Sequence, residues 1–316
     1  MTLTRVHHVG LVTDDLKWAR RVLCEGFGLA IDAHRTPWPD GRRRASDGAT
    51  VLEVPIGEMF YEVAKPSDDQ SDAARYLAAT NGRGGIQFIA LASDDLSTDL
   101  DRLAQHGVRP RAQADADGAV GLDPASCLGL DVRLVVEDHY YVHPAYRGNG
   151  AVTGMAHIGI AARSARAIRQ LWGEAFGLAE DSRSAASLGR DEEPSPRTVA
   201  AGMSLDPVHL LEFPIGGSVI EISIPTSAES GTARLVEQRA PFGAVYHHTC
   251  PYTPDVYRFM DQAEAAGLQS IGELPPPGER EMVVGWLHPR SCLGMLIEVW
   301  NRPPGPGHYR PHPHPA

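Results

Sequence analysis

Two histidines and two glutamates in the second half of the chain have the chemistry of metal ligands. They are His157 in GMAHIGIA, Glu221 in SVIEISIP, His248 in AVYHHTCPY and Glu298 in GMLIEVW. Each stands in a short segment whose apolar pattern predicts a β-strand, where a charged side chain is costly unless a partner or a cation compensates it. Imidazole nitrogen and carboxylate oxygen suit divalent Zn, Mn, Fe, Co or Ni. We therefore expect the four residues to hold one divalent metal ion.

Four such ligands on an octahedral ion leave two neighbouring positions for a bidentate oxygen substrate, which is typical of a catalytic site. Any one of these residues alone is more commonly a satisfied core or surface side chain, so the prediction depends on the set. Strand alternation places Tyr246 and Cys250 on the face of His248, and Trp300 on the face of Glu298. His247 should face the other way and pack, or support the ligands.

The elements that position these residues occur twice along the chain. In the first half, RVHHVGLV, a helix capped by Asp14 or Asp15, and the strands ATVLEVPIG and MFYEVAKP form a β-α-β-β unit. GGIQFIAL, a helix capped by Ser93, and LDVRLVVE form a second. The same order returns from GMAHIGIA onward, with the last helix predicted from Pro254 to Ala266 and capped by Thr253.

Two pairs of short motifs make chance similarity a poor explanation for this order. LEVPIG matches LEFPIG, and PASCLG matches PRSCLG. We infer an internal duplication. It makes His8, Glu62, Phe88 and Arg133 the counterparts of the four candidate ligands. Because phenylalanine cannot bind a metal and arginine brings a positive charge, the site in the first half should be degenerate.

Composition narrows the class of protein and of partner. The chain has 316 residues, 42% of them hydrophobic, enough for two domains with a core. A net charge of −11 argues against nucleic acid or an anionic membrane as partner. No signal peptide or membrane span is recognisable, so a cytoplasmic location is expected. Four cysteines without a CxxC pair indicate reduced thiols.

The segments HIGIA, SVIEISIP, YHHTC and LHPRSCLGMLIEVW resemble the four ligand-bearing segments of the vicinal oxygen chelate superfamily, the glyoxalase and bleomycin-resistance fold. The likeness is closest to methylmalonyl-CoA epimerases. It implies an α+β fold of four βαβββ modules in two tandem domains around one metal. We expect an N-terminal domain at 1–138 with a degenerate site, a linker at 139–152, a C-terminal domain at 153–303 with the metal site, and a disordered Pro- and His-rich tail at 304–316.

Two departures from known members limit what the resemblance implies. Methylmalonyl-CoA epimerases are single paired-module chains that dimerise, so CoA recognition does not carry over to this longer chain. Two-domain extradiol dioxygenases share the long architecture and use His, His and Glu at the positions of His157, His248 and Glu298, but lack a carboxylate ligand at that of Glu221. Their segment also usually carries a Tyr where VVGWLHPRSCLG has Trp286. These departures favour non-redox chemistry.

The resemblance therefore predicts an enzyme, an epimerase, isomerase or lyase, whose metal polarises a small carbonyl or carboxylate substrate and stabilises an enolate. The base would be Glu298, Glu221 or His209, and the loop between Ser182 and Pro207 could form a lid. The alternatives are a ring-cleaving dioxygenase and a metal-free binding or resistance protein. A small-molecule substrate is the expected partner, and a homodimer is compatible with the resemblance.

Overall fold

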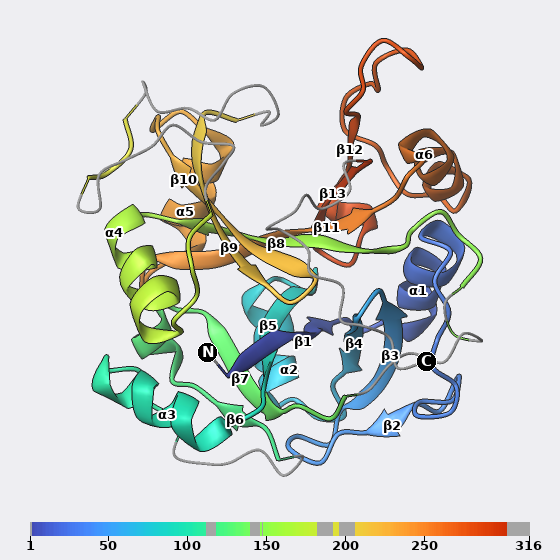
Figure 1. Cartoon of the computed structure of the whole chain (residues 1–316). Helices are drawn as coiled ribbons and strands as arrows, with labels where there is room; N and C mark the ends of the chain where they lie inside the picture. Colours follow the sequence, from blue (N-terminus) through green and yellow to red (C-terminus); the bar gives the residue numbers. More distant parts are fainter. Residues whose placement is uncertain are drawn as a thin grey trace.

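The computed structural model of the chain describes residues 2–111, 118–139, 146, 148–181, 192–195 and 206–301. Two curled mixed sheets, one from each half of the chain, stand one above the other in Figure 1. Within the described ranges, no helix has the length and apolar character needed to cross a lipid bilayer. The predicted tail, most of the linker and most of the proposed lid lie outside the described residues.

The N-terminal sheet has seven strands in the order β2-β3-β4-β1-β5-β7-β6. They are β1 (Leu3–Val12), β2 (Arg42–Arg43), β3 (Thr50–Ile56), β4 (Met59–Lys65), β5 (Gly85–Ser93), β6 (Val120–Gly121) and β7 (Asp131–Val136). The central β1 pairs parallel with β4 and antiparallel with β5. It is buried almost throughout because both of its faces are covered.

The C-terminal sheet has six strands in the order β12-β13-β11-β8-β10-β9. They are β8 (Gly154–Ala162), β9 (Val208–Ile215), β10 (Ser218–Pro225), β11 (Ala244–Tyr252), β12 (Val284–Leu287) and β13 (Leu296–Trp300). Here β8 is the central strand, parallel to β10 and antiparallel to β11. The two sheets therefore share one topology around equivalent central strands.

The helices lie between these strands in chain order. They are α1 (Leu16–Arg20) with its π-helical continuation η1 (Arg21–Gly26), α2 (Asp72–Ala79), α3 (Leu96–Gln105), η2 (Pro124–Cys127), α4 (Ala165–Ile168) with its π-helical continuation η4 (Arg169–Ala175), α5 (Gly231–Arg239), α6 (Val256–Ala265) and η5 (Pro289–Ser291). The change from α to π geometry at matching places in α1 and α4 supports the duplication.

The starts of three helices follow one local pattern. Asp15, Asp95 and Asp255 accept hydrogen bonds from first-turn backbone N–H groups of α1, α3 and α6. The hydroxyl two residues earlier accepts from the backbone N–H of the aspartate itself. Asp15 is thus confirmed as a cap. The prediction for Ser93 and Thr253 is wrong, because each ends the strand and orients the aspartate that faces the first turn.

Four modules are present, as the sequence predicts, and they differ in how completely they form. The first has all four strands, β1, β2, β3 and β4. In the second and fourth, one strand is reduced to a single bridge, Pro110 with Leu122 and Ser270 with Leu287. In the third, the corresponding part of the chain falls largely outside the described residues. The described residues therefore form two curled mixed sheets with helices, which agrees with the predicted α+β fold of four modules in two tandem domains.

The turns after β6 and β12 preserve the duplicated motif in detail. Leu128 of PASCLG and Leu293 of PRSCLG both have left-handed backbone conformations, with φ of 57° and 56°. The cysteine before each leucine is fully buried. An L-residue with a side chain adopts this conformation only where its surroundings compensate the strain, so the repeat reflects a shared local structure.

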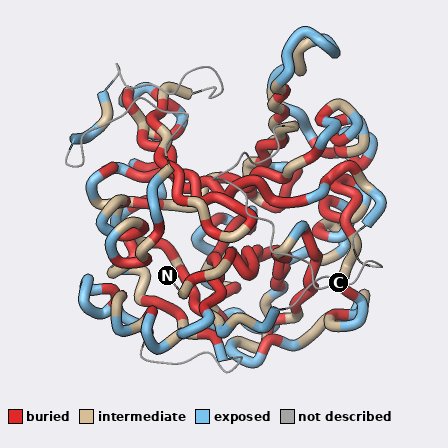
Figure 2. The backbone as a smooth tube through the Cα atoms, viewed as in Figure 1, coloured by how far each residue is buried: buried red, intermediate tan, exposed pale blue. Residues whose placement is uncertain are grey.

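The two sheets turn their back faces towards each other, and their concave faces open away from each other (Figure 1). Tyr61 on β4 and Thr249 on β11 share a buried hydrogen bond of 2.9 Å across this boundary. Helices pair across it as well, since Phe27 after η1 packs on Phe259 of α6. Buried residues from both halves form one continuous core (Figure 2). Each concave face is therefore a separate candidate site on a common support.

Candidate metal centre

Four neighbouring strands of the C-terminal sheet each supply one of the predicted ligands. His157 lies on β8, Glu221 on β10, His248 on β11 and Glu298 on β13, and the order β13-β11-β8-β10 places these strands side by side. Glu221 and His248 both pair with Gly159, two residues after His157. The sheet register thus brings all four side chains to one patch of the concave face.

Gly159 makes room for the imidazole of His248. A Cβ atom at this position would lie 2.0 Å from Cε1 of His248. This glycine was not among the residues predicted from the sequence, although the pattern His-x-Gly occurs in both halves, as His8-Val9-Gly10 and His157-Ile158-Gly159. A repeated glycine two residues beyond a candidate ligand was the signal that could have identified it.

The donor atoms lie at separations that one metal ion would require. Nε2 of His157 is 3.0 Å from Nε2 of His248. Oε2 of Glu298 is 3.2 and 3.3 Å from these two nitrogens, and Oε1 of Glu221 is 3.7 Å from each. All four atoms lie within 4.8 Å of one another. For bonds of about 2.1 Å, neighbouring ligand atoms are about 3 Å apart and opposite ones about 4 Å. The donor set therefore fits one divalent ion.

Burying two carboxylates side by side costs free energy unless a positive charge compensates them. Each of the four side chains is at most 8% exposed. Burial by itself raises the pKa of Glu298, but hydrogen bonds from His157 and His248 hold it well below its usual range. Burial likewise favours neutral His157, yet interactions with Cys250 and the two carboxylates raise its pKa. The pKa of Glu221 is raised, chiefly by burial. A divalent ion would compensate both carboxylates.

His247 supports His248 from the side away from the donor atoms. The Nδ1 atoms of the two rings are 3.2 Å apart, so one can donate a hydrogen bond to the other. This leaves Nε2 of His248 directed at the other ligands, an arrangement common around metal-binding histidines. The supporting role predicted for His247 is therefore consistent with the geometry.

Two tryptophans flank the cluster. The ring of Trp300 is 5.0 Å from that of His157, and the ring of Trp286 is 5.9 Å from that of His248, both edge to face. The buried indole Nε1 of Trp300 has no hydrogen-bond partner among the described residues. Buried donors normally have partners, so this N–H group is available to a ligand oxygen.

Two sequence predictions about neighbouring residues do not agree with the strand register. A bulge at His247 pairs Tyr246 with Ile160, so Tyr246 faces away from His248 and donates to the carbonyl of Asp131. His209 pairs with Ile224, whereas Glu212 pairs with Glu221. Because side chains alternate, His209 lies on the opposite face from Glu221. This placement gives no support to His209 as a base, and it brings Glu212 beside the cluster instead.

The equivalent place in the N-terminal sheet is filled by protein side chains. Gly10 pairs with Phe88 as Gly159 pairs with His248, and a Cβ at Gly10 would lie 2.1 Å from the Phe88 ring. The guanidinium of Arg133 stacks on that ring, 3.5 Å from its centre. Glu62 accepts a 2.7 Å hydrogen bond from buried Arg44. Arginine cations thus compensate the carboxylate that a metal would compensate, as expected for a degenerate site.

Comparisons with known proteins agree with this fold. Residues 7–123 match the model of the Glyoxalase/Bleomycin resistance protein/Dioxygenase superfamily. This match covers most of the N-terminal half and shows what that half is similar to. No curated protein sequence matches the chain.

Among solved structures, a mutant of 4-hydroxymandelate synthase from Streptomyces coelicolor aligns with a TM-score of 0.62 and 15% identity, over 96% of this chain and 93% of that one. A xylose isomerase-like TIM barrel/4-hydroxyphenylpyruvate dioxygenase fusion protein aligns with a TM-score of 0.60 and 13% identity, over 96% of this chain and 50% of that one. Identities this low establish a shared fold alone. The closer likeness to methylmalonyl-CoA epimerases stays a prediction.

Proposed function

We propose that the C-terminal domain is a divalent-metal-dependent enzyme that epimerises, isomerises or cleaves a small carbonyl or carboxylate substrate without redox chemistry. The observation that carries this proposal is the cluster of four buried donor atoms within 4.8 Å, two of them carboxylate oxygens. Four protein ligands leave two positions on an octahedral ion, which two oxygens of one substrate can occupy. When bound, the ion supplies Lewis acidity that makes protons next to a carbonyl more acidic.

The four residues have different roles in this proposal: three hold the ion, and the fourth also moves a proton. His157, His248 and Glu298 form the tighter group, because their donor atoms approach within 3.0 to 3.3 Å of each other. Glu221 stands further off, with its Oε1 3.7 Å from both imidazoles. It is therefore the carboxylate better placed to leave the cluster, take a proton from the substrate carbon on Oε1 and return it. The low exposure of the ligands and the two indoles keep water away from this exchange.

A second candidate function is an Fe(II) ring-cleaving dioxygenase. His157, His248 and Glu298 make up a two-histidine, one-carboxylate set, and a named dioxygenase fusion protein shares the fold. Under this alternative Glu221 would stay off the ion and leave room for both a substrate and dioxygen. Oxygen dependence of turnover distinguishes the two candidates.

The test begins with metal analysis of purified wild type, Glu221→Gln and His248→Ala. We expect about one divalent ion per wild-type chain and a loss of at least tenfold in affinity for His248→Ala; equal metal content in these two proteins would contradict the metal centre. Anaerobic protein loaded with Mn, Co or Zn should exchange protons next to the carbonyl of 2-oxo and 2-methyl acids with deuterium from solvent. Oxygen uptake with catechols, without such exchange, would support the dioxygenase.

A further inference from the structure

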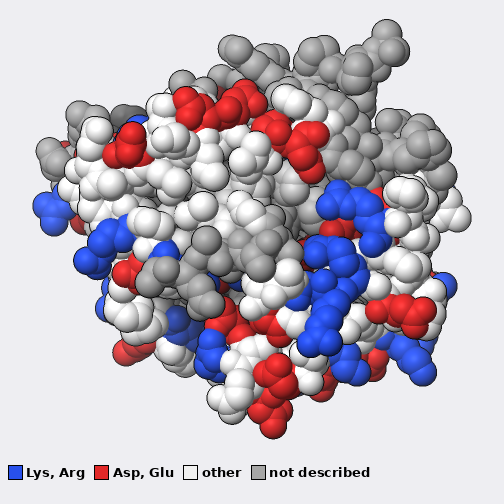
Figure 3. All heavy atoms as spheres, turned by 90° about the horizontal axis from the view of Figure 1, so that it is seen from below, with Lys and Arg blue, Asp and Glu red and all other residues white. Residues whose placement is uncertain are grey.

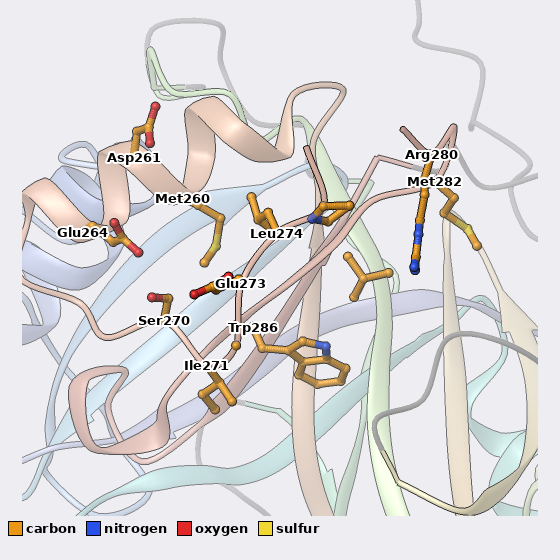
Figure 4. A pocket seen from close by; sticks show the side chains of 13 residues that line it. Met260, Asp261, Glu264, Ser270, Ile271, Glu273, Leu274, Arg280, Met282 and Trp286 are labelled. Carbon is orange, nitrogen blue, oxygen red and sulfur yellow. The ribbon is translucent and has the colours of Figure 1, made fainter. Parts of the chain in front are cut away.

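A cavity of about 670 Å³ lies beside the metal centre, within the range of small-molecule sites. Its walls come from α6, from the segment Ser270–Pro275, from the chain around Arg280 and Met282, and from Val284 and Trp286 on the edge strand β12. Much of this lining is apolar, contributed by residues such as Met260, Leu274 and Val284 (Figure 4). The cavity can therefore accept the apolar body of an organic molecule.

Trp286 connects this cavity to the proposed ligands. It pairs with Glu298 across β12 and β13, so the two side chains emerge on the same face of the sheet. Its ring also contacts His248, with ring centres 5.9 Å apart. The donor atoms themselves are enclosed, and a chelating molecule longer than its two bound oxygens must extend away from them. Trp286 both lines the cavity and contacts His248, so it marks the direction in which such a molecule would extend.

Charge is distributed unevenly around the cavity. Figure 4 shows Asp261, Glu264 and Glu273 on the α6 side, whereas Arg280 lies on the side of Trp286 and Met282 with its side chain directed into the cavity. Arg280 is exposed and forms no hydrogen bond or ion pair with the described residues. A guanidinium group at the wall of an apolar cavity binds a carboxylate with two parallel hydrogen bonds.

We propose that the substrate is an organic acid with three parts: two vicinal oxygens that chelate the ion, an apolar body that lies against Trp286, and a distal carboxylate that pairs with Arg280. This inference rests on the proposed function, since the chelating end requires the metal. Arg280 is the specificity-determining residue, and the acidic side chains across the cavity repel the same carboxylate and so favour its orientation towards Arg280.

Two chelating probes that differ only in the distal group test this assignment. Benzohydroxamate offers vicinal oxygens and an apolar ring, and 4-carboxybenzohydroxamate adds the distal carboxylate. Calorimetric titration of the Ni(II)-loaded protein should show about twofold to fivefold tighter binding of the carboxylated probe, because Arg280 is exposed and solvent screens its pairing with a carboxylate. Arg280→Gln should remove this preference while leaving benzohydroxamate affinity unchanged. Arg290→Gln, on an exposed arginine outside the cavity lining, is the matched control.

The outcomes distinguish failure of the role assigned to Arg280 from failure of the metal centre. Equal affinity of the two probes for the wild type, or a preference that survives in Arg280→Gln, overturns the role of Arg280 and leaves the metal centre standing. Failure of both probes to bind metal-loaded protein, or failure of the protein to hold metal, overturns the proposed function itself. Trp286→Ala should weaken both probes several-fold, and unchanged affinities in this variant would overturn the placement of the apolar body.

Discussion

Glu298 on β13 and Arg133 on β7 occupy equivalent positions in the two sheets and carry opposite charges. In the C-terminal sheet His248 pairs with Leu296, and Glu298 follows two residues later. In the N-terminal sheet Phe88, the counterpart of His248, pairs with Asp131, and Arg133 follows two residues later. A carboxylate at this position completes a cation-binding cluster, whereas a guanidinium group supplies a cation itself. The duplicated fold thus supports one cluster that could hold a metal and one that is balanced by arginine. On the molecular surface, Figure 3 shows Lys and Arg side chains gathered in one area of the face seen from below.

Gly159, which pairs with His248, and Gly10, which pairs with Phe88, allow the same substitution to be tested in both halves. Gly159→Ala should lower metal affinity at least tenfold, because the new Cβ would lie 2.0 Å from His248 and displace its ring. Gly10→Ala introduces the same clash with Phe88 in the other half. It should destabilise the protein but leave about one ion per chain. Metal analysis with circular dichroism checks both, and full metal content in a folded Gly159→Ala protein would refute the argument.

Arg44 stabilises the N-terminal half by compensating Glu62. Its side chain is 3% exposed and lies 2.7 Å from both Glu62 and Asp47. Removing one partner of a buried ion pair typically costs about 3 kcal/mol, so Arg44→Ala should lower the free energy of unfolding by that order. Arg43→Ala, at the exposed neighbouring position, should change it by less than about 0.5 kcal/mol. Urea denaturation measures both, and similar effects would argue against a compensating role for Arg44.

Glu137 gives the protein a defined acid sensitivity. Burial raises the pKa of its carboxyl group, but hydrogen bonds from Arg5 and Thr4 outweigh burial and lower it to about 2 from 4.5. Because the folded-state pKa is depressed, the stabilisation is present above about pH 4.5 and is lost as the pH falls towards 2. Between pH 5 and pH 3 the advantage of wild type over Glu137→Gln should shrink by about 1 to 2 kcal/mol in urea denaturation. A pH-independent difference would contradict this account.

Much of the fold and the candidate cluster could be predicted because the duplication left short identical motifs in the same order. Comparison of the two halves then distinguished His248 from His247, because the counterpart of His248 in the first half is Phe88, which cannot bind a metal. The faces of some neighbouring side chains could not be predicted, because they depend on how the strands pair. Alternation of side chains between the two faces of a strand assumes uninterrupted pairing, and the bulge at His247 turns Tyr246 to the other face. The face of His209 was accessible in principle, because the two-residue turn at Gly216 and Gly217 fixes which residues of β9 and β10 pair.

Trp300 and Trp172 offer a last comparison, because the indole Nε1 of each is buried and lacks a partner among the described residues. Trp300 lies against His157, whereas Trp172 stacks on Phe176 in the helical layer. If the Trp300 N–H group donates to a chelated oxygen, Trp300→Phe should weaken benzohydroxamate binding about fivefold to tenfold, the effect of one lost hydrogen bond. Trp172→Phe loses the same donor away from the metal and should leave the affinity unchanged. Calorimetric titration of both Ni(II)-loaded variants gives the answer, and an equal change in the two would show that the indole N–H of Trp300 has no part in binding.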